Sequence, residues 1–304
     1  MKPYLIGDTL RSARFWIQDF DAMRVADMIC ATKNGDGSPK LVIFQGICRY
    51  MNLHSIHRCS HIGTRFDAND FLERGKNGRI VFAGDSICRN QWESLICMLA
   101  QGVSNQSTIY EEHGNPITKH KGFLSIKFQE YNLKVQYYRV PYLVIIDRPP
   151  QIARRSEGVI RVDKLHRFSD KWIGANVLVF SSGHWWNQDK TLNSGREWNK
   201  GGTCNTSREP ETDYSKLELE PPNNIMIYEA TEQMKSAMRT VNFLNITYLT
   251  EFRSDGHPSR NSEPGTPVDA PEDCSHWCLP GVPDTWNELL YAELLRMEFR
   301  TRMT

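Results

Sequence analysis

Short apolar runs alternate with longer amphipathic segments over most of the chain after residue 79. RIVFAG (Arg79–Gly84) and NVLVFSS (Asn176–Ser182) are apolar runs of strand length. Between them, KVQYYRV (Lys134–Val140) alternates as a strand would, and an apolar LVII follows shortly after. Continuous apolar strands are typical of a parallel sheet covered on both faces, so these runs predict an α/β fold.

Helical spacing of apolar residues marks three further segments. NQWESLICML (Asn90–Leu99) gathers its large apolar side chains on one face. Asn223–Thr240 predicts a long helix, followed by a strand over Val241–Leu249. The last helix begins at Pro283, a residue suited to a first turn, and runs to about residue 299. Helices alternating with strands support the parallel-sheet prediction.

The first 60 residues have weak periodicity. Thr9–Ile29 predicts a helix, Asn34–Pro39 is rich in turn-forming residues, and the LVIF after it predicts a strand. We therefore divide the chain into an atypical N-terminal region, residues 1–60, and an α/β domain, residues 61–304.

Charge and hydropathy exclude two classes of partner. The chain has 37 Lys and Arg against 36 Asp and Glu, without a basic stripe, so we expect no nucleic-acid partner. It has no apolar run long enough for a transmembrane helix, and its first residues lack the apolar core of a secretory signal. On these grounds alone the chain would be cytosolic.

Cysteines and glycosylation triplets favour the alternative, the secretory pathway. Eight cysteines are an even number, which suits disulfides in an oxidising compartment but also occurs in reduced proteins. Asn-x-Ser/Thr triplets occur at Asn105, Asn205 and Asn245. Both compartments stay open at this point.

The first candidate for chemistry is Gly84-Asp85-Ser86, where an apolar strand ends and a helix is predicted to begin. Ligands of parallel α/β sheets bind at the carboxyl ends of the strands. A serine at a helix start has N–H groups behind it for an oxyanion, but its hydroxyl needs a base to become a nucleophile. The alternative is that Asp85 or Ser86 only caps the helix.

His276 is the candidate base, because Asp273 lies three residues before it and can orient its imidazole. Ser86, His276 and Asp273 are therefore a candidate triad. Cys274 and Cys278 bracket the histidine, which raises zinc as an alternative, but no CxxC pair elsewhere completes a four-ligand site. We expect no metal, and disulfides instead, with candidate cysteines Cys59, Cys204, Cys274 and Cys278 and no connectivity fixed.

Several long motifs carry a family resemblance from about Phe66 to Leu295. They read GDSICRNQWESL, NPITKHKGFL, YYRVPYLV, GHWWN, GGTCNTSREPET, LNITYLTEFRSDGHPSR and DCSHWCLPGVPDTWNELL. Together they resemble the plant trichome birefringence-like family of cell-wall polysaccharide O-acetyltransferases (PC-esterase domain), which are relatives of the GDSL/SGNH esterases. The resemblance implies an SGNH-hydrolase-like parallel sheet flanked by helices, with residues 61–304 as the catalytic domain.

The resemblance also assigns roles. Ser86 matches the nucleophile, and Asp273 and His276 match the D-x-x-H motif. Residues matching the motifs around the serine, or occupying plausible oxyanion positions, are Gly84, Asp85, Arg89, Asn90, Gly114 and Gly183. His184, Trp185 and Trp186 are candidate sugar-binding residues, the alternative for the two tryptophans being packing.

The implied activity is transfer of acetyl to a hydroxyl of xylan or pectin through an acetyl-serine. No bound cofactor is implied, but an acetyl donor is required, with acetyl-CoA as a candidate. Family members are Golgi membrane proteins held by an anchor helix that this chain does not show. The alternatives are an acetylesterase with the same triad, and an inactive or polysaccharide-binding remnant.

Two departures from the family pattern stand out. GHWWNQDK is followed within a few residues by REWNKGGTC, where relatives have several dozen residues that include a helix and a central strand. Loss of that strand would leave an incomplete sheet with unpaired edges. In addition, Ser181 stands where many relatives have an asparagine.

Overall fold

A seven-stranded sheet forms the centre of the computed structural model, with strand order β3-β4-β5-β2-β8-β1-β9. The structure describes residues 41–46, 65–118, 120–147, 159–186, 204, 206–217, 222–236, 240–258 and 272–301. The strands of this sheet are β1 (Leu41–Gly46), β2 (Arg79–Gly84), β3 (Ile109–Glu111), β4 (Phe123–Phe128), β5 (Leu133–Arg139), β8 (Val177–Ser181) and β9 (Val241–Asn245).

The sheet is mostly parallel. β5, β2, β8, β1 and β9 pair in parallel, whereas β3 and β4 are antiparallel and form one edge. A separate hairpin joins β6 (Val144–Asp147) to β7 (Val159–Leu165). The predicted SGNH-like α/β fold is thus confirmed, with an antiparallel edge that the apolar pattern did not indicate.

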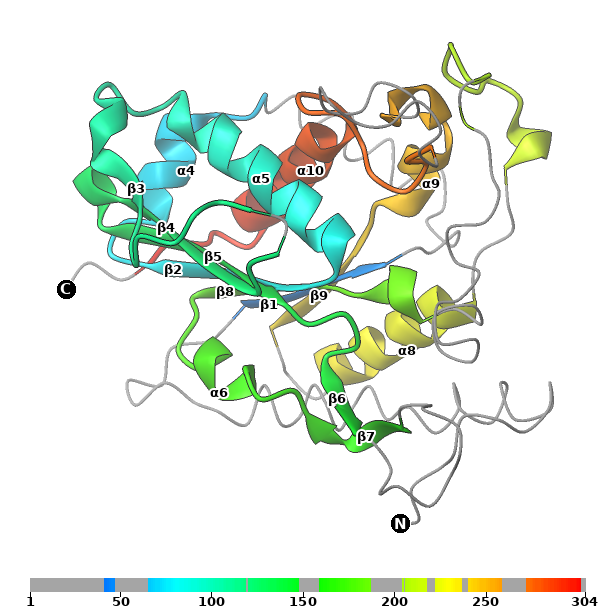
Figure 1. Cartoon of the computed structure of the whole chain (residues 1–304), viewed down its shortest axis with the longest axis horizontal. Helices are drawn as coiled ribbons and strands as arrows, with labels where there is room; N and C mark the ends of the chain where they lie inside the picture. The colour runs from blue at the N-terminus through cyan, green and yellow to red at the C-terminus, as the bar shows by residue number, and fades with distance from the viewer. Residues whose placement is uncertain are drawn as a thin grey trace.

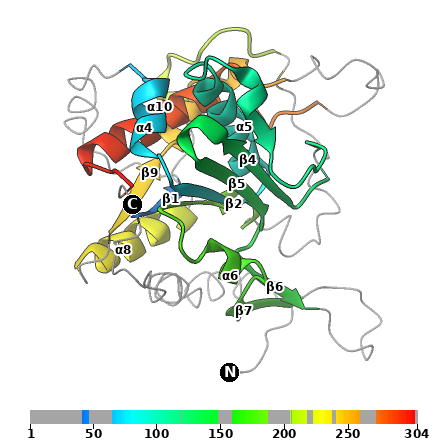
Figure 2. The same ribbon diagram turned by 90° about the vertical axis from the view of Figure 1, so that its left-hand side faces the viewer.

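Helices cover both faces of the sheet (Figures 1 and 2). One face carries α4 (Ala68–Arg74), α5 (Ser86–Ala100) and α10 (Val282–Arg296), and the other carries α6 (Ser169–Trp172) and α8 (Pro222–Ser236). Alternate residues of β2 enter the two cores: Ile80 and Phe82 pack on the α5 side, Val81 and Ala83 on the α6 and α8 side. This double burial explains why the strand is apolar at successive positions.

β1 lies between β8 and the edge strand β9. Ile43 is fully buried and aligns with Val179 on one side and Asn242 on the other. The strand comes from the N-terminal region, residues 1–60, so that region supplies part of the central sheet. In the described structure β1 pairs on both sides, so β8 does not have the unpaired edge expected from the loss of a strand.

Element boundaries differ from the sequence prediction at several places. α5 begins at Ser86, four residues before the predicted start, because Asp85 caps it. The predicted strand over 241–249 ends at Asn245, and α9 (Thr247–Glu251) follows. The LVII run lies in β6, outside the main sheet. The predicted helix over 9–29 lies outside the described residues.

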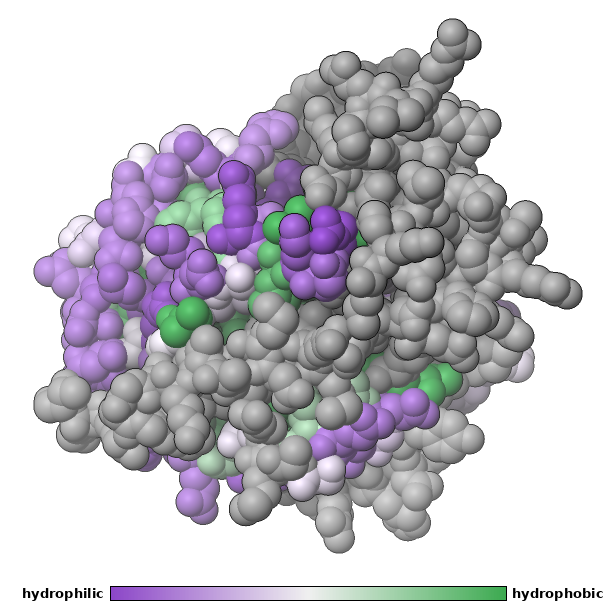
Figure 3. All heavy atoms as spheres, turned by 90° about the horizontal axis from the view of Figure 1, so that it is seen from below, coloured by the Kyte–Doolittle hydropathy of each residue, from purple (hydrophilic) through white to green (hydrophobic). Residues whose placement is uncertain are grey.

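The face that carries α6 and α8 is the lower one in Figure 1, and Figure 3 views it from below. Where described residues are visible there, hydrophilic side chains surround small hydrophobic patches. Among the helices that the structure describes, none combines the length and the apolar character needed to cross a membrane.

Candidate active site

Gly84 lets β2 approach its neighbour closely at the end of the strand. A Cβ on Gly84 would lie 1.8 Å from the carbonyl oxygen of Ser181 on β8, far inside van der Waals contact. The N–H of Asp85 donates to that same carbonyl at 3.0 Å. Any side chain at Gly84 would force β2 and β8 apart, so glycine sets the turn that leads into α5.

Asp85, rather than Ser86, caps α5. Its carboxylate accepts from the N–H of Ile87 at 2.9 Å and of Cys88 at 3.4 Å. The buried Tyr137 hydroxyl donates to the Asp85 carbonyl at 3.0 Å and fixes the turn from the other side. Ser86 is therefore the first residue of the helix, and its hydroxyl makes no hydrogen bond within the described part of the chain. Helix capping, the alternative role expected for Ser86, is therefore carried out by Asp85.

Asp273 and His276 form a directly bonded pair. The Nδ1 of His276 lies 2.9 Å and 3.0 Å from the two carboxylate oxygens of Asp273. The carboxylate also accepts from the N–H groups of Ser275 and His276, each at 3.1 Å. With Nδ1 engaged as a donor, the Nε2 of His276 is the nitrogen that can take a proton from a nucleophile.

The pKa of Asp273 is held well below its ordinary value. Burial on its own raises this pKa, but the hydrogen bond and charge of His276, together with the two backbone N–H groups, lower it by more. The side chains of His276 and Asp273 are 34 % and 36 % exposed, so the pair remains open to solvent. An ionised carboxylate behind an accessible imidazole is the arrangement that a general base requires.

Asn90 holds the loop of this pair against α5. Its side-chain amide donates to the Trp277 carbonyl at 3.1 Å, and its oxygen accepts from the Trp277 N–H at 2.8 Å. Because Asn90 lies four residues after Ser86 on α5, the two side chains share a helix face. The loop that carries His276 therefore sits beside the first turn of α5. No hydrogen bond joins Ser86 to His276 among the described residues, which is common in unliganded sites.

A second set of contacts holds the same loop from its other side. The Nδ1 of His257 lies 2.6 Å from the His276 carbonyl, and its ring packs on Trp277 at 4.5 Å between centroids. The Cys278 N–H donates to the Gly256 carbonyl at 3.0 Å. The loop that carries His276 is thus fixed between α5 and the loop at residues 254–257.

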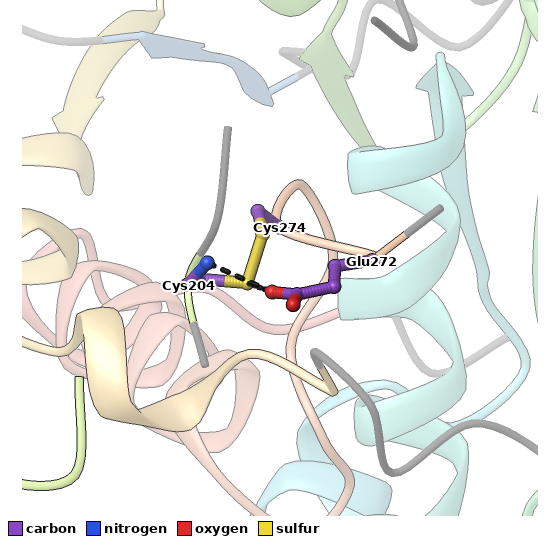
Figure 4. Close-up of side chains that lie close together, drawn as sticks. All are labelled: Cys204, Glu272 and Cys274. Atoms are coloured by element: carbon purple, nitrogen blue, oxygen red, sulfur yellow. Dashed lines mark hydrogen bonds between the residues drawn. A yellow bond between two sulfur atoms is a disulfide. The ribbon is translucent and has the colours of Figure 1, made fainter. Parts of the chain in front are cut away.

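A disulfide between Cys204 and Cys274 ties the residue after Asp273 to a segment 70 residues away (Figure 4). Glu272 lies beside it and accepts from the Cys204 N–H at 3.0 Å. These three side chains have the spacing of metal ligands, but both sulfurs are committed to the disulfide rather than available as thiolates. Cys278 is exposed and is not bonded to a described cysteine, and Cys59 lies outside the described residues.

Two glycines were expected near an oxyanion site, and the structure separates them. Gly114 has φ of 68° and uses its N–H in a turn, donating to the Glu111 carbonyl at 3.2 Å. Gly183 follows the end of β8, next to the strand that delivers Ser86. No hydrogen bond from the N–H of Ser86 or Gly183 is found within the described ranges. These two groups are the better candidates for holding an oxyanion.

The tryptophans of GHWWN are both half-buried. Trp185 and Trp186 meet the Tyr142 ring edge-on, at 5.6 Å and 5.5 Å between centroids, and pack against the core on the α6 and α8 side. His184 is exposed. The packing role expected as the alternative is therefore present, while sugar binding by these residues stays a prediction.

Comparison with known proteins fits the geometry of this site. A family model described as PC-Esterase, the GDSL/SGNH-like acyl-esterase family found in Pmr5 and Cas1p, matches residues 64–196 and 191–293. The chain belongs to the PC-esterase family. It is 49 % identical over 292 residues to Protein trichome birefringence-like 9 of Arabidopsis thaliana, covering 78 % of this chain and 71 % of that protein.

Other relatives carry the same family name. Protein trichome birefringence-like 6 of Arabidopsis thaliana is 35 % identical, over 76 % of this chain and 59 % of its own length. Protein trichome birefringence of the same plant is 32 % identical, over 76 % of this chain and 47 % of its own length. The trichome birefringence-like resemblance is confirmed, and this chain spans only part of these family members.

The family match breaks inside this chain. The family model matches the chain in two separate pieces, which overlap at residues 191–196. The alignment to Protein trichome birefringence-like 9 runs over 292 positions yet takes in only 78 % of a 304-residue chain, so the relative has residues that this chain lacks. Both observations agree with the internal shortening expected after GHWWNQDK.

Within the PC-esterase site, two residues have positioning roles that sequence reasoning missed. Asn90 was assigned only as part of the motif after the serine, and His257 was not singled out. Both side chains bond to backbone groups of His276 or Trp277. Such contacts do not depend on the type of the residue whose backbone is bonded, so the sequence does not indicate them. Arg89, which was predicted as a motif residue, has a structural role: it donates to the Thr118 carbonyl at 2.6 Å and pairs with Glu93 at 2.7 Å.

Replacing Asn90 with alanine is expected to slow acylation of Ser86 by about 10–100-fold, because a misplaced base costs rate even when the chemistry is intact. Stopped-flow measurement of the acylation burst with an aryl acetate gives this rate. The matched control is Asn69→Ala, which removes an exposed helical asparagine on α4. A burst rate equal to that of the control would show that the Asn90 contacts do not position His276.

Proposed function

We propose that this PC-esterase is a polysaccharide O-acetyltransferase that carries acetyl on Ser86 and delivers it to a hydroxyl of a plant cell-wall polysaccharide of the xylan or pectin class. The observation that carries the proposal is the Asn90 contact: one turn after Ser86 on α5, Asn90 holds the loop of the bonded Asp273–His276 pair, while Asp85 takes the capping role. Family membership supports acyl-esterase or O-acetyltransferase chemistry in general.

The first step transfers acetyl to the enzyme. His276 Nε2 takes the Ser86 proton while Oγ attacks the acetyl carbonyl, and the N–H groups of Ser86 and Gly183 receive the oxyanion. The bond to the donor's leaving group then breaks, and that group leaves with the proton from His276. No bound cofactor is needed, but an acetyl donor is, and acetyl-CoA is one candidate.

The second step reverses these roles. His276 takes a proton from a sugar hydroxyl, which attacks the acetyl-serine, and Ser86 leaves with that proton. Water competes with the sugar, because the imidazole and carboxylate are about one-third exposed. This exposure favours a second candidate, an acetylesterase that removes acetyl from the same polymers with the same triad.

Transfer and hydrolysis are separated by mass. The full chain is incubated with an acetyl donor and unmodified oligosaccharide, and in parallel with acetylated oligosaccharide alone. A transferase adds acetyl to the first, whereas an esterase only removes it from the second. No mass change in either sugar would contradict both activities and leave a noncatalytic polysaccharide-binding remnant.

We also propose that the protein resides in the Golgi membrane, as the family resemblance implies. The Cys204–Cys274 disulfide beside the site supports an oxidising compartment. Fractionation of plant cells expressing the tagged full-length protein tests this location, with a cytosolic distribution as the contradicting result.

A further inference from the structure

A groove of about 390 Å³ lies on the sheet face opposite α5. Its floor is the outward face of the β4–β5 pair, and α6 borders it. Residues that line it include Phe123, Lys134, Gln136, Tyr138, Phe168 and Lys171. This volume falls within the range of about 300–1,000 Å³ typical of ligand sites. The triad lies on the other side of the sheet and does not use it.

Aromatic rings form one end of the groove. Phe123 and Tyr138 lie opposite each other across the β4–β5 pair, with ring centroids 4.7 Å apart. Phe168 continues the row at 5.4 Å from Tyr138, and His113 extends it at 5.4 Å from Phe123. Flat apolar ring faces beside polar groups can pack against the C–H faces of pyranoses.

Cations gather toward the other end. Lys127 and Lys134 are register partners across β4 and β5, an arrangement of like charges that destabilises a sheet. Burial and the Lys134 charge lower the pKa of Lys127, against the opposing effect of the nearby Glu112 carboxylate. Lys171 is exposed at the rim and has no carboxylate partner in the part of the chain that the structure describes.

Neighbouring groups leave positive charge in excess. Glu112 pairs with Lys134, and the carboxylate of Glu111 is taken up by three backbone N–H groups. Arg79 donates to the Lys171 carbonyl at 2.8 Å and to the Gln136 side-chain oxygen at 3.3 Å, without a carboxylate among the described residues. The four cations Arg79, Lys127, Lys134 and Lys171 thus outnumber the two carboxylates Glu111 and Glu112, and this excess would attract an anionic ligand.

We infer that this groove binds an acidic oligosaccharide, with sugar rings against Phe123, Tyr138 and Phe168 and carboxylates near Lys134 and Lys171. The choice of a polysaccharide rests on the proposed function. The anionic character rests on the charges of the groove itself.

The orientation of the groove suits a polymer. Lys134 aligns with Arg79 at the start of β2, and Tyr138 aligns with Ala83, three residues before Ser86. The groove therefore follows the strands for about 13 Å, with its aromatic end toward the edge of the sheet where Ser86 lies. A chain held here is retained by the enzyme while another part of it reacts.

Calorimetric titration tests the inference with an oligogalacturonide and a neutral xylo-oligosaccharide of equal length. The wild-type chain is expected to bind the acidic sugar more tightly, and added salt is expected to weaken that binding. Lys171→Gln is expected to weaken it about fivefold and Phe168→Ala about tenfold. The matched control is Lys235→Gln on α8, which lies on the same face as the groove but packs on β1 and β9, near the opposite edge of the sheet.

Equal affinity for the two sugars, or wild-type affinity in both groove variants, would overturn the inference. Acylation of Ser86 by an aryl acetate, measured on the same proteins, keeps the two proposals separate. Normal acylation with no acidic-sugar binding refutes the groove alone. Acidic-sugar binding that depends on Lys171 and Phe168, without any acylation, refutes the acetyl-serine function alone.

Discussion

Replacing Ser86 with alanine is expected to lower acetyl capture by on the order of 10⁴-fold or more, because the variant lacks the atom that forms the acyl bond. The fold should tolerate the change. Asp85 supplies the helix cap, and the Ser86 hydroxyl makes no hydrogen bond within the described residues. The measurement is the burst of aryl acetate cleavage, together with thermal unfolding.

Ser107→Ala provides the matched control for this variant. Ser107 is an exposed serine beyond the opposite end of α5, a helix of 15 residues and so about 22 Å long. The Ser107→Ala variant should keep the full burst of aryl acetate cleavage. If Ser86→Ala retained the burst while remaining folded, another group would be the nucleophile and the mechanism would be wrong.

Replacing Asp273 with asparagine is expected to lower the same burst rate by about 10³–10⁴-fold. The amide oxygen can still accept from the Ser275 and His276 N–H groups, so the loop should keep its shape. The amide no longer carries the charge that stabilises an imidazolium and no longer selects the tautomer with Nδ1–H. Asp213→Asn, at an exposed cap on η4 (Tyr214–Lys216), is the control.

The same variant should change the acid dependence of stability. In the native protein the pKa of Asp273 lies below its ordinary value, despite the opposing effect of burial, because of its bonds to His276 and to backbone N–H groups. Its stabilising contribution is therefore present above about pH 4 and is lost as the pH falls further. The free energy of unfolding of the wild type and of Asp273→Asn, measured at several pH values from neutral to acid, gives this contribution. A constant stability difference over that range would contradict the paired carboxylate.

Much of the central sheet could be predicted from the sequence, because its strands are buried on both faces. RIVFAG and NVLVFSS became β2 and β8, and the predicted helix after the serine became α5. The antiparallel edge was missed because β4 carries Ser125 and Lys127 on its groove side, which breaks up the apolar run. Nothing in the LVIF of the N-terminal region indicated its partner strands, since strand order depends on contacts distant in sequence.

The candidate site, like the sheet, could be predicted only in part. Gly84-Asp85-Ser86 alone was also consistent with a helix cap, so the sequence singled out Ser86, Asp273 and His276 only through the Asp-to-His spacing and the family motifs. Their assembly could not be predicted, because it depends on Asn90 holding a peptide group 187 residues away. The groove could not be predicted from the sequence either, since its lysines and aromatic rings come from separate segments that meet only across β4, β5 and α6.

Mass-spectrometric mapping of the acyl group tests the central claim most directly. The full chain is incubated with an acetyl donor, quenched in acid, digested, and searched for peptides heavier by one acetyl group. The account predicts a single acetyl on Ser86 in the wild type, chased off by acceptor oligosaccharide, and none in Ser86→Ala. An acetyl group on a different residue, or undiminished labelling of Ser86→Ala, would contradict it.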